Sequence, residues 1–310
     1  MKGNDILDAI GNTPLVELQR LSNRSGVRIF AKLEGHNPTG SVKDRIVKHI
    51  IQRAEESGEL THDKTIVEAT TGNTGIALAM IGRLKGYRVK LAVPENVGPE
   101  IKQLLALYGA EVVWSDPRNG TNGAIELASK MACEPDHFLL GQFTSQANPQ
   151  AHFETTGPEI LRALPRVDVF VAGLGTAGTL VGVGRCLKER NPRTRVVGVE
   201  PHADEMVQGL RSLEDGFISP ILDMGLLSGK MVVASREAFV AAREVTRQEG
   251  ILCGVSSGAV LHCALRVAEK MRSGNIVVLF ADGGWKYLST RLWTRDLGEL
   301  ATHIDGKIWW

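Results

Sequence analysis

Two kinds of apolar pattern alternate along nearly the whole chain. Short runs rich in β-branched residues predict strands, and the longer amphipathic runs between them predict helices. This alternation is typical of α/β proteins with mostly parallel sheets. The runs VDVFVAG and NIVVLFA are apolar on both faces, as strands covered on both sides are. The expected strands are 28–33, 65–69, 88–93, 111–115, 167–172, 195–200 and 275–281, and the expected helices are 43–57, 73–85, 100–108, 120–131, 154–164, 179–189, 236–249 and 257–271.

Composition limits the kind of partner. The chain has 310 residues, 43% of them hydrophobic, which suggests two domains with apolar cores. Its 36 basic and 35 acidic residues nearly cancel, so nucleic acid and an anionic membrane surface are not expected as partners. No segment approaches the ~20 apolar residues of a membrane span, and no signal-peptide pattern opens the chain. The scattered cysteines predict buried free thiols in a reducing cytoplasm and no metal site; they are Cys133, Cys186, Cys253 and Cys263.

The segment NPTGSVKDR (37–45) leads into a predicted helix. Pro38 and Gly40 predict a turn, and Ser41 is a candidate N-cap. Lys43 then falls in the first helical turn, where unpaired N–H groups make a cation unfavourable. We interpret Lys43 as a candidate nucleophilic amine or Schiff-base lysine. The alternative is that its side chain simply extends into solvent.

Three further glycine-rich segments open helices. TTGNTG (70–75) offers hydroxyls and N–H groups but no basic residue, which favours a carboxylate ligand over a triphosphate; an ordinary turn is the alternative. GLGTAGT (173–179) matches the dinucleotide fingerprint, with Glu200 placed for a ribose, but it suits a smaller phosphorylated cofactor equally well. In GVSSGA (254–259), Ser256 or Ser257 could be only an N-cap. The stretch 202–234 lacks periodicity, which is typical of a functional loop.

Taken in order, these segments resemble the cysteine synthase family of pyridoxal-phosphate enzymes, of fold type II like the tryptophan synthase β chain. IGNTPL (10–15), Gln142-Phe143 and TTGPEI (155–160) extend the resemblance over essentially the whole chain. Thr71 stands where most members have serine. Ala177 stands where many have glycine or threonine, and we expect it to exclude a left-handed backbone in its loop.

The resemblance implies an architecture of two three-layer αβα domains with mostly parallel sheets. A larger domain (1–37 and 148–310) would bind pyridoxal 5'-phosphate, and a smaller mobile domain (38–147) would bind substrate. A homodimer is also implied.

The resemblance further implies the role of each site residue. Lys43 would hold the cofactor as a Schiff base and, once released, act as general base at the substrate Cα. Asn73 would hydrogen-bond the ring hydroxyl, and Ser256 would face the pyridine nitrogen. The phosphate would lie on Gly175, Thr176, Ala177, Gly178 and Thr179, and the substrate carboxylate on Thr70, Thr71, Gly72, Thr74 and Gln142. The reaction would be β-elimination to an α-aminoacrylate, followed by addition of sulfur to give L-cysteine.

Two segments indicate a branch of the family. DGGWKYLST (282–290) resembles the B-type cysteine synthases, and GLRSLEDGF (209–217) resembles the O-phosphoserine-dependent branch. Arg211 would then contact the substrate phosphate; alternatively it is a surface arginine paired with Glu214 or Asp215. An O-acetylserine sulfhydrylase is the nearest alternative function. A non-catalytic binding partner and an NAD-dependent oxidoreductase are alternatives of other classes.

The sulfur donor is left open among sulfide, thiosulfate and a carrier protein with a C-terminal thiocarboxylate. The ending DGKIWW (305–310) places two tryptophans at the terminus. We expect them to be covered, either on the protein's own surface or on a dimer partner, or by folding into the active-site cleft.

Overall fold

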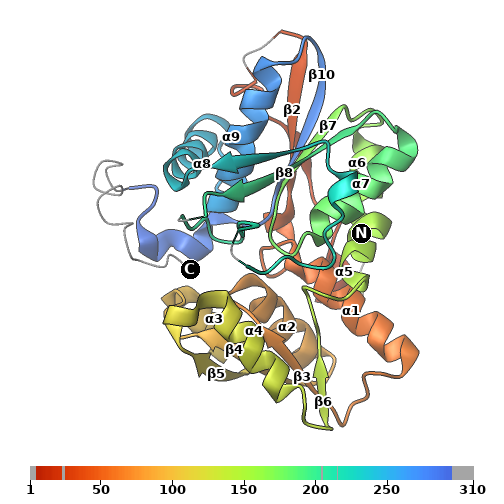
Figure 1. Cartoon of the computed structure of the whole chain (residues 1–310), viewed down its shortest axis with the longest axis vertical. Coiled ribbons are helices and arrows are strands. Elements are labelled where there is room, and N and C mark those ends of the chain that lie inside the picture. Colours follow the sequence, from red (N-terminus) through yellow and green to blue (C-terminus); the bar gives the residue numbers. More distant parts are fainter. Residues whose placement is uncertain (1–4, 23–24, 204, 215, 295–310) are drawn as a thin grey trace.

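The computed structural model describes residues 5–22, 25–203, 205–214 and 216–294 (Figure 1). Two sheets, each covered by helices on both faces, make up this part of the chain. The α/β architecture of layered, mostly parallel sheets is therefore confirmed. No helix among these residues is long and apolar enough to cross a membrane.

The six-stranded sheet has the order β1-β2-β10-β7-β8-β9. Only β1 is antiparallel to its neighbour, and the other pairs are parallel. Apolar side chains on one face pack under α8 and α9, and those on the other pack under α6 and α7. The elements are β1 (Leu15–Glu17), β2 (Val27–Leu33), β7 (Val169–Gly173), β8 (Arg195–Pro201), β9 (Gly229–Val233), β10 (Gly274–Phe280), α6 (Gly157–Ala163), α7 (Gly178–Arg190), α8 (Ser235–Glu249) and α9 (Val255–Glu269).

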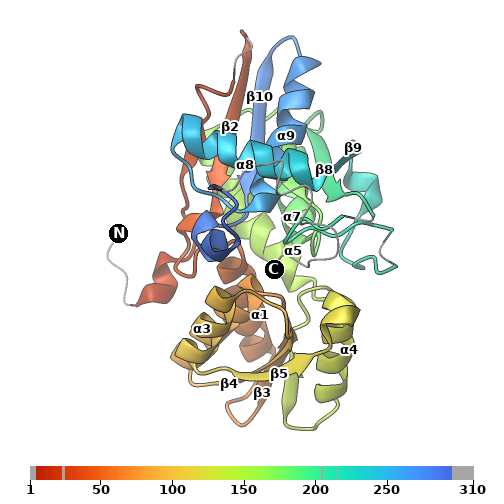
Figure 2. The same cartoon turned by 90° about the vertical axis from the view of Figure 1, so that its left-hand side faces the viewer.

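The four-stranded sheet has the order β5-β4-β3-β6 and is parallel throughout. Figure 2 shows α1 and α3 on one side of this sheet and α4 on the other. Alanines at positions 124 and 128 of α4 allow it to lie close to β3 and β4. The elements are β3 (Thr65–Ala69), β4 (Arg88–Pro94), β5 (Glu111–Ser115), β6 (His137–Leu139), α1 (Lys43–Ser57), α2 (Asn73–Leu84), α3 (Pro99–Tyr108) and α4 (Gly120–Met131).

With one exception, the expected strands and helices are present, with ends shifted by a few residues. The expected helix 154–164 is instead a π-helical turn, η4 (His152–Thr156), followed by α6. Four short elements have no counterpart in the expected set: β1, β6, β9 and α5 (Ala147–Ala151). The remaining short turns are η1 (Ile6–Ala9), η2 (Glu34–His36), η3 (Pro117–Asn119), η5 (Met224–Leu226) and η6 (Gly284–Thr290).

The start of α1 differs from the expectation by one residue. Val42, not Ser41, is the N-cap, although the Ser41 hydroxyl accepts a hydrogen bond from the Lys43 N–H at 3.3 Å. Ser41 instead forms an isolated bridge with Asp282, and the Val42 N–H donates to the Ala281 carbonyl at 2.8 Å. The turn before Lys43 is thus held against the chain that leaves β10.

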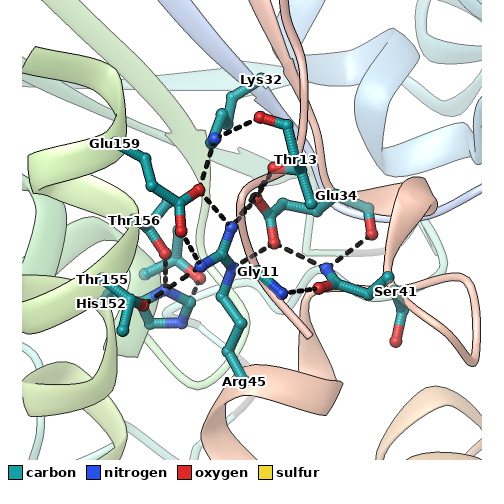
Figure 3. Close-up of polar contacts among 12 residues, drawn as sticks. Gly11, Thr13, Lys32, Glu34, Ser41, Arg45, His152, Thr155, Thr156 and Glu159 are labelled. Carbon is teal, nitrogen blue, oxygen red and sulfur yellow. Dashed lines mark hydrogen bonds and ion pairs between the residues drawn. The ribbon is translucent and has the colours of Figure 1, made fainter. Parts of the chain in front are cut away.

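A buried ion cluster anchors α1 to the six-stranded sheet (Figure 3). The Arg45 guanidinium donates to Glu34 through Nε at 2.6 Å, and to Glu159 through Nη1 and Nη2, each at 2.7 Å. Lys32 of β2 donates to Glu159 at 2.6 Å. Burial would raise the pKa of Glu159, but the hydrogen bonds from Arg45 and Lys32 lower it to about 2. Two cations and two carboxylates therefore compensate one another inside the protein.

Candidate active site

A cavity lies where strands of both sheets end. Its lining comes from the segments that follow β3, β6, β7 and β10, together with the start of α1, the start of α9 and the loop after β8. Carboxyl ends of parallel strands are the usual place for a ligand in α/β proteins. Thirteen predicted site residues line this cavity: Lys43, Thr70, Thr71, Gly72, Asn73, Thr74, Gln142, Gly175, Thr176, Ala177, Thr179, Arg211 and Ser256.

Gly178 is the predicted residue that the cavity lining does not include. It is the first residue of α7, and an added Cβ there would lie 1.8 Å from Oδ1 of Asn148. A side chain at this position would thus collide with a buried neighbour. Gly178 therefore permits close packing behind the loop.

Lys43 is the first residue of α1, is partly buried and lines the cavity. Burial lowers the pKa of its amine to about 8; the Lys286 ammonium lowers it further, while the Asp282 carboxylate works in the opposite direction. The alternative of a solvent-exposed lysine is therefore wrong. A substantial neutral fraction near physiological pH is what a nucleophilic or basic amine requires.

The TTGNTG loop is braced from within. The Thr70 hydroxyl accepts hydrogen bonds from the N–H groups of Gly72 at 3.0 Å and Gly75 at 2.9 Å. The Thr74 hydroxyl donates to Oε1 of Gln142 at 2.7 Å, and the Gln142 amide donates to the Ala69 carbonyl at 2.9 Å. These contacts fix a small polar concavity at the N-terminus of α2, where an anion is favoured.

The loop between β7 and α7 corrects one expectation. Ala177 has φ of 68° and is therefore left-handed, although we expected it to exclude that conformation. Left-handed backbone costs an alanine roughly 1–2 kcal/mol, so the surrounding packing must hold it. A Cβ on Gly175 would lie 2.7 Å from the Gly209 carbonyl oxygen, so this loop also needs a glycine there.

His152, which the sequence analysis did not select, supports the same loop. Its ring contacts Oγ1 of Thr179 at 3.1 Å through Nε2 and Oγ1 of Thr156 at 2.9 Å through Nδ1. Burial, with the nearby charges of Arg45 and Lys43, lowers the pKa of His152 well below its usual value, so the ring is neutral. Its place three residues before TTGPEI was the available sequence signal.

Two alternatives from the sequence do not fit the structure. Glu200 is buried, accepts a hydrogen bond from the Leu213 N–H at 2.8 Å and pairs with Lys230 at 2.5 Å, so its carboxylate is not placed for a ribose. Ser256 is not the N-cap of α9, because Gly254 occupies that position. Ser256 instead lines the cavity.

Arg211 stands on the loop after β8 and reaches toward α4. Its guanidinium carbon lies 5.0 Å from the ring centre of Phe217 and 5.6 Å from that of Phe143. Its Nη2 donates to Oδ1 of Asn122 at 2.7 Å. The guanidinium is thus held beside the cavity by the faces of two aromatic rings and a cross-sheet hydrogen bond. Asp215, one of its alternative partners, lies outside the described residues.

A group of residues from the end of the chain was also missed. Asp282 accepts hydrogen bonds from Nδ2 of Asn73 at 2.7 Å and from the Tyr287 hydroxyl. Lys286 donates to Oδ1 of Asn73 and, at 3.3 Å, to the Gly40 carbonyl. From the sequence, the segment that holds Asp282, Lys286 and Tyr287 served only to mark the branch.

The donor set fits a phosphorylated carbonyl cofactor. It combines an amine of lowered pKa, a tight glycine loop at a helix N-terminus, and hydroxyl and amide groups around one cavity. A group of three or more metal-ligating side chains does not occur among the described residues. This combination defines a class of enzyme that uses pyridoxal phosphate.

Comparison with known proteins agrees with that class. A family of proteins described as pyridoxal-phosphate dependent enzymes matches residues 6–282, and the chain belongs to this family. Its cofactor is pyridoxal phosphate. The chain is 42% identical to cysteine synthase B of Salmonella typhimurium over 93% of this chain and 95% of that protein. It is also 42% identical to cysteine synthase B of Escherichia coli, over 91% of this chain and 93% of that protein.

Solved structures of similar proteins share the fold. A cysteine synthase (OASS) from Entamoeba histolytica superposes with a TM-score of 0.90 at 33% identity, covering 99% of this chain and 97% of that one. A hydrogen sulfide-producing enzyme from Fusobacterium nucleatum superposes with a TM-score of 0.88 at 39% identity, covering 92% of this chain and 100% of that one.

The cysteine expectation is partly wrong. Cys253 and Cys263 are buried, and burial raises the pKa of each thiol. Cys133 is exposed and Cys186 is partly exposed. The C-terminal segment 305–310, including both terminal tryptophans, lies outside the described residues.

Proposed function

We propose that this protein is a cysteine synthase that replaces the β-substituent of an O-substituted serine with sulfur, and that it prefers O-phosphoserine. The observation that carries the preference is the position of Arg211. Its guanidinium lies at the same cavity as Lys43 and is held by Phe143, Phe217 and Asn122. A guanidinium binds a phosphate through a charged fork, and it offers a neutral acetyl group much less.

Lys43 is the proposed catalytic residue. Pyridoxal phosphate, when bound, supplies the electron-withdrawing system that makes the substrate Cα–H acidic. The Lys43 amine, with its pKa of about 8, accepts that proton when it is neutral. Desolvation of the amine favours its neutral form.

The other site residues bind and orient. Asn73 and Ser256 would contact the cofactor ring, and the loop at Gly175, Thr176, Ala177, Gly178 and Thr179 would hold its phosphate. The neutral His152 ring supports Thr179 from behind. The substrate carboxylate would lie against the braced loop and Gln142, at Thr70, Thr71, Gly72 and Thr74.

The larger-scale proposals follow the same resemblance. We propose a smaller mobile domain (38–147) against a larger one (1–37 and 148–310), a homodimer, and a cytoplasmic location. The four-stranded sheet falls within 65–139 and supports the smaller domain. The four free cysteines support the cytoplasmic location. A thiocarboxylated carrier protein is proposed as a sulfur donor beside sulfide and thiosulfate.

The test compares kcat/KM for O-phosphoserine and O-acetylserine. Arg211→Ala should lower the value for O-phosphoserine by ~10²-fold, the effect of losing a charged fork of about 3 kcal/mol, and should affect O-acetylserine far less. Arg247→Ala is the matched control, because Arg247 is an exposed arginine of α8 paired only with Glu244 among the described contacts. Equal losses for both substrates would mean that Arg211 does not recognise phosphate, and would favour an O-acetylserine sulfhydrylase.

A further inference from the structure

Lys286 is a buried lysine with no role in the function proposed above. It belongs to η6, and only 1% of its surface is exposed. Its ammonium donates to Oδ1 of Asn73 and to the Gly40 carbonyl, and it lies 5.3 Å from the ring centre of Trp285. One side chain thus touches the first residue of α2 and the turn that precedes Lys43.

The contacts of Lys286 determine how the Asn73 side chain lies. Lysine can only donate, so the end of the Asn73 carboxamide facing Lys286 is its oxygen. The other end, Nδ2, donates to the Asp282 carboxylate at 2.7 Å. A carboxamide bound at both ends cannot turn over without breaking both contacts. The amide nitrogen, which is the end able to donate to a ring hydroxyl, is therefore fixed at the cavity wall.

We propose that Lys286 is a positioning residue for the cofactor, acting by locking the Asn73 carboxamide and the Gly40 turn. This role rests on the proposed contact between Asn73 and the cofactor. Lys286 itself is not catalytic, because it contacts the cavity residues from behind and does not line the cavity.

The surrounding charges are consistent with this role. Lys43 is faced by Asp282, Lys286 and the buried His152, and the Lys286 charge contributes to the lowered pKa of Lys43 after burial itself. Lys286 is faced by Asp282 and Asp44; burial lowers its pKa, and these carboxylates oppose that effect. Removing the Lys286 charge should therefore raise the pKa of Lys43, because a like charge disfavours the protonated form.

Two measurements on the full-length protein without substrate test the proposal. One is the dissociation constant for pyridoxal phosphate. The other is the pH midpoint of acetylation of Lys43 by trace acetic anhydride in the cofactor-free protein, read by mass spectrometry. Lys286→Met should weaken cofactor binding at least ~10-fold, because a buried acceptor on Asn73 loses its donor. It should also move the Lys43 midpoint to higher pH.

Two variants separate the parts of the effect. Lys286→Arg keeps the charge and should leave the Lys43 midpoint unchanged. Lys286→Gln keeps a donor for Asn73 but removes the charge, so the midpoint should rise while cofactor binding changes less than in Lys286→Met. Lys230→Met is the control. It removes the ion pair between Lys230 and the buried carboxylate of Glu200, and neither residue lines the cavity. The cofactor dissociation constant and the Lys43 midpoint of this variant should match those of the unmodified protein.

Unchanged cofactor binding and an unchanged midpoint in Lys286→Met would show that Lys286 is only structural. If Lys286→Met does not fold, unchanged cofactor binding together with an unchanged Lys43 midpoint in Lys286→Gln would overturn the proposal. Neither measurement involves a substrate. Failure of the protein to make cysteine would therefore contradict the proposed function and leave the Lys286 result standing.

Discussion

Ala177 shows how a single residue can depart from the pattern that its neighbours predict. Its sequence context predicts a phosphate loop, and a residue with a Cβ argues against a left-handed backbone there. The structure keeps the left-handed backbone, with φ of 68°, and buries the methyl group against Val181, Ile221 and Leu226. The packing of that methyl group therefore offsets part of the conformational cost.

This balance predicts an unusual response to glycine. Ala177→Gly relieves about 1–2 kcal/mol of left-handed strain, which stabilises the folded protein. It also removes a buried methyl group worth about 1 kcal/mol and makes the unfolded chain more flexible, and both of these effects destabilise the folded protein. The free energy of unfolding should therefore change by less than ~1 kcal/mol. Ala177→Val should lower it by at least ~2 kcal/mol, because a β-branched residue tolerates positive φ poorly. Urea unfolding measures both.

Ala241→Gly supplies the comparison, since Ala241 is a buried alanine inside α8. Ala241→Gly relieves no left-handed strain, so it should lower the free energy of unfolding by about 1–2 kcal/mol. If Ala177→Gly costs as much as Ala241→Gly, the left-handed strain has no measurable energetic effect.

Single residues also show where sequence reasoning ends. The place of Lys43, Asn73 and Ser256 at the cavity could be predicted, because each sits in a motif next to a glycine-rich turn. Lys286 could not be assigned a role, because its contact with Asn73 joins positions 213 residues apart. Long-range polar contacts of this kind leave no local periodicity in a sequence.

At the scale of elements, the placement of α1 depends on an anchor near its first turn. Its hydrophobic face packs with α2 in the core of the four-stranded sheet, whereas Arg45 pairs with Glu34 and Glu159 beside the six-stranded sheet. The helix that carries Lys43 is thus tied to both sheets. Figure 3 shows the polar contacts of its Arg45. Because all four charged side chains of the cluster are nine-tenths buried or more, loss of one leaves its partners without compensation.

Arg45→Met should therefore lower the free energy of unfolding by about 3–5 kcal/mol, the cost of leaving buried carboxylates unpaired. Arg53→Met on the same helix should change it by less than ~0.5 kcal/mol, because Arg53 is half exposed and its ion pairs are at the surface. Denaturant unfolding of both variants checks the contrast. An Arg45→Met effect as small as that of Arg53→Met would mean that the cluster does not anchor α1.

The three strands that were not predicted each leave a weak pattern in the sequence. β1 and β6 are only three residues long, which is too short for alternation to be recognised. β9 has a mostly exposed pattern and pairs at the sheet edge, so burial does not shape its sequence. It lies within the stretch 202–234, most of whose described residues form turns and irregular chain.

At the scale of the whole molecule, the cavity lies where the carboxyl ends of parallel strands from the two sheets meet. Its residues come from segments spread between Val42 and Tyr287. The alternating pattern could predict the order of the elements and an α/β class, and the family resemblance implied two domains with mostly parallel sheets. It could not place Arg211 against Asn122, because that contact joins the loop after β8 to a helix of the other sheet.

The central claim is that these residues together make a pyridoxal-phosphate-dependent cysteine synthase with Lys43 as its catalytic residue. The most direct measurement is the formation of L-cysteine and phosphate by the full-length protein with pyridoxal phosphate, O-phosphoserine and sulfide. We expect equal amounts of the two products, and a loss of at least ~10³-fold in Lys43→Ala at unchanged thermal stability. No cysteine from the unmodified protein with either O-phosphoserine or O-acetylserine, or substantial turnover by Lys43→Ala without added amine, would contradict the claim.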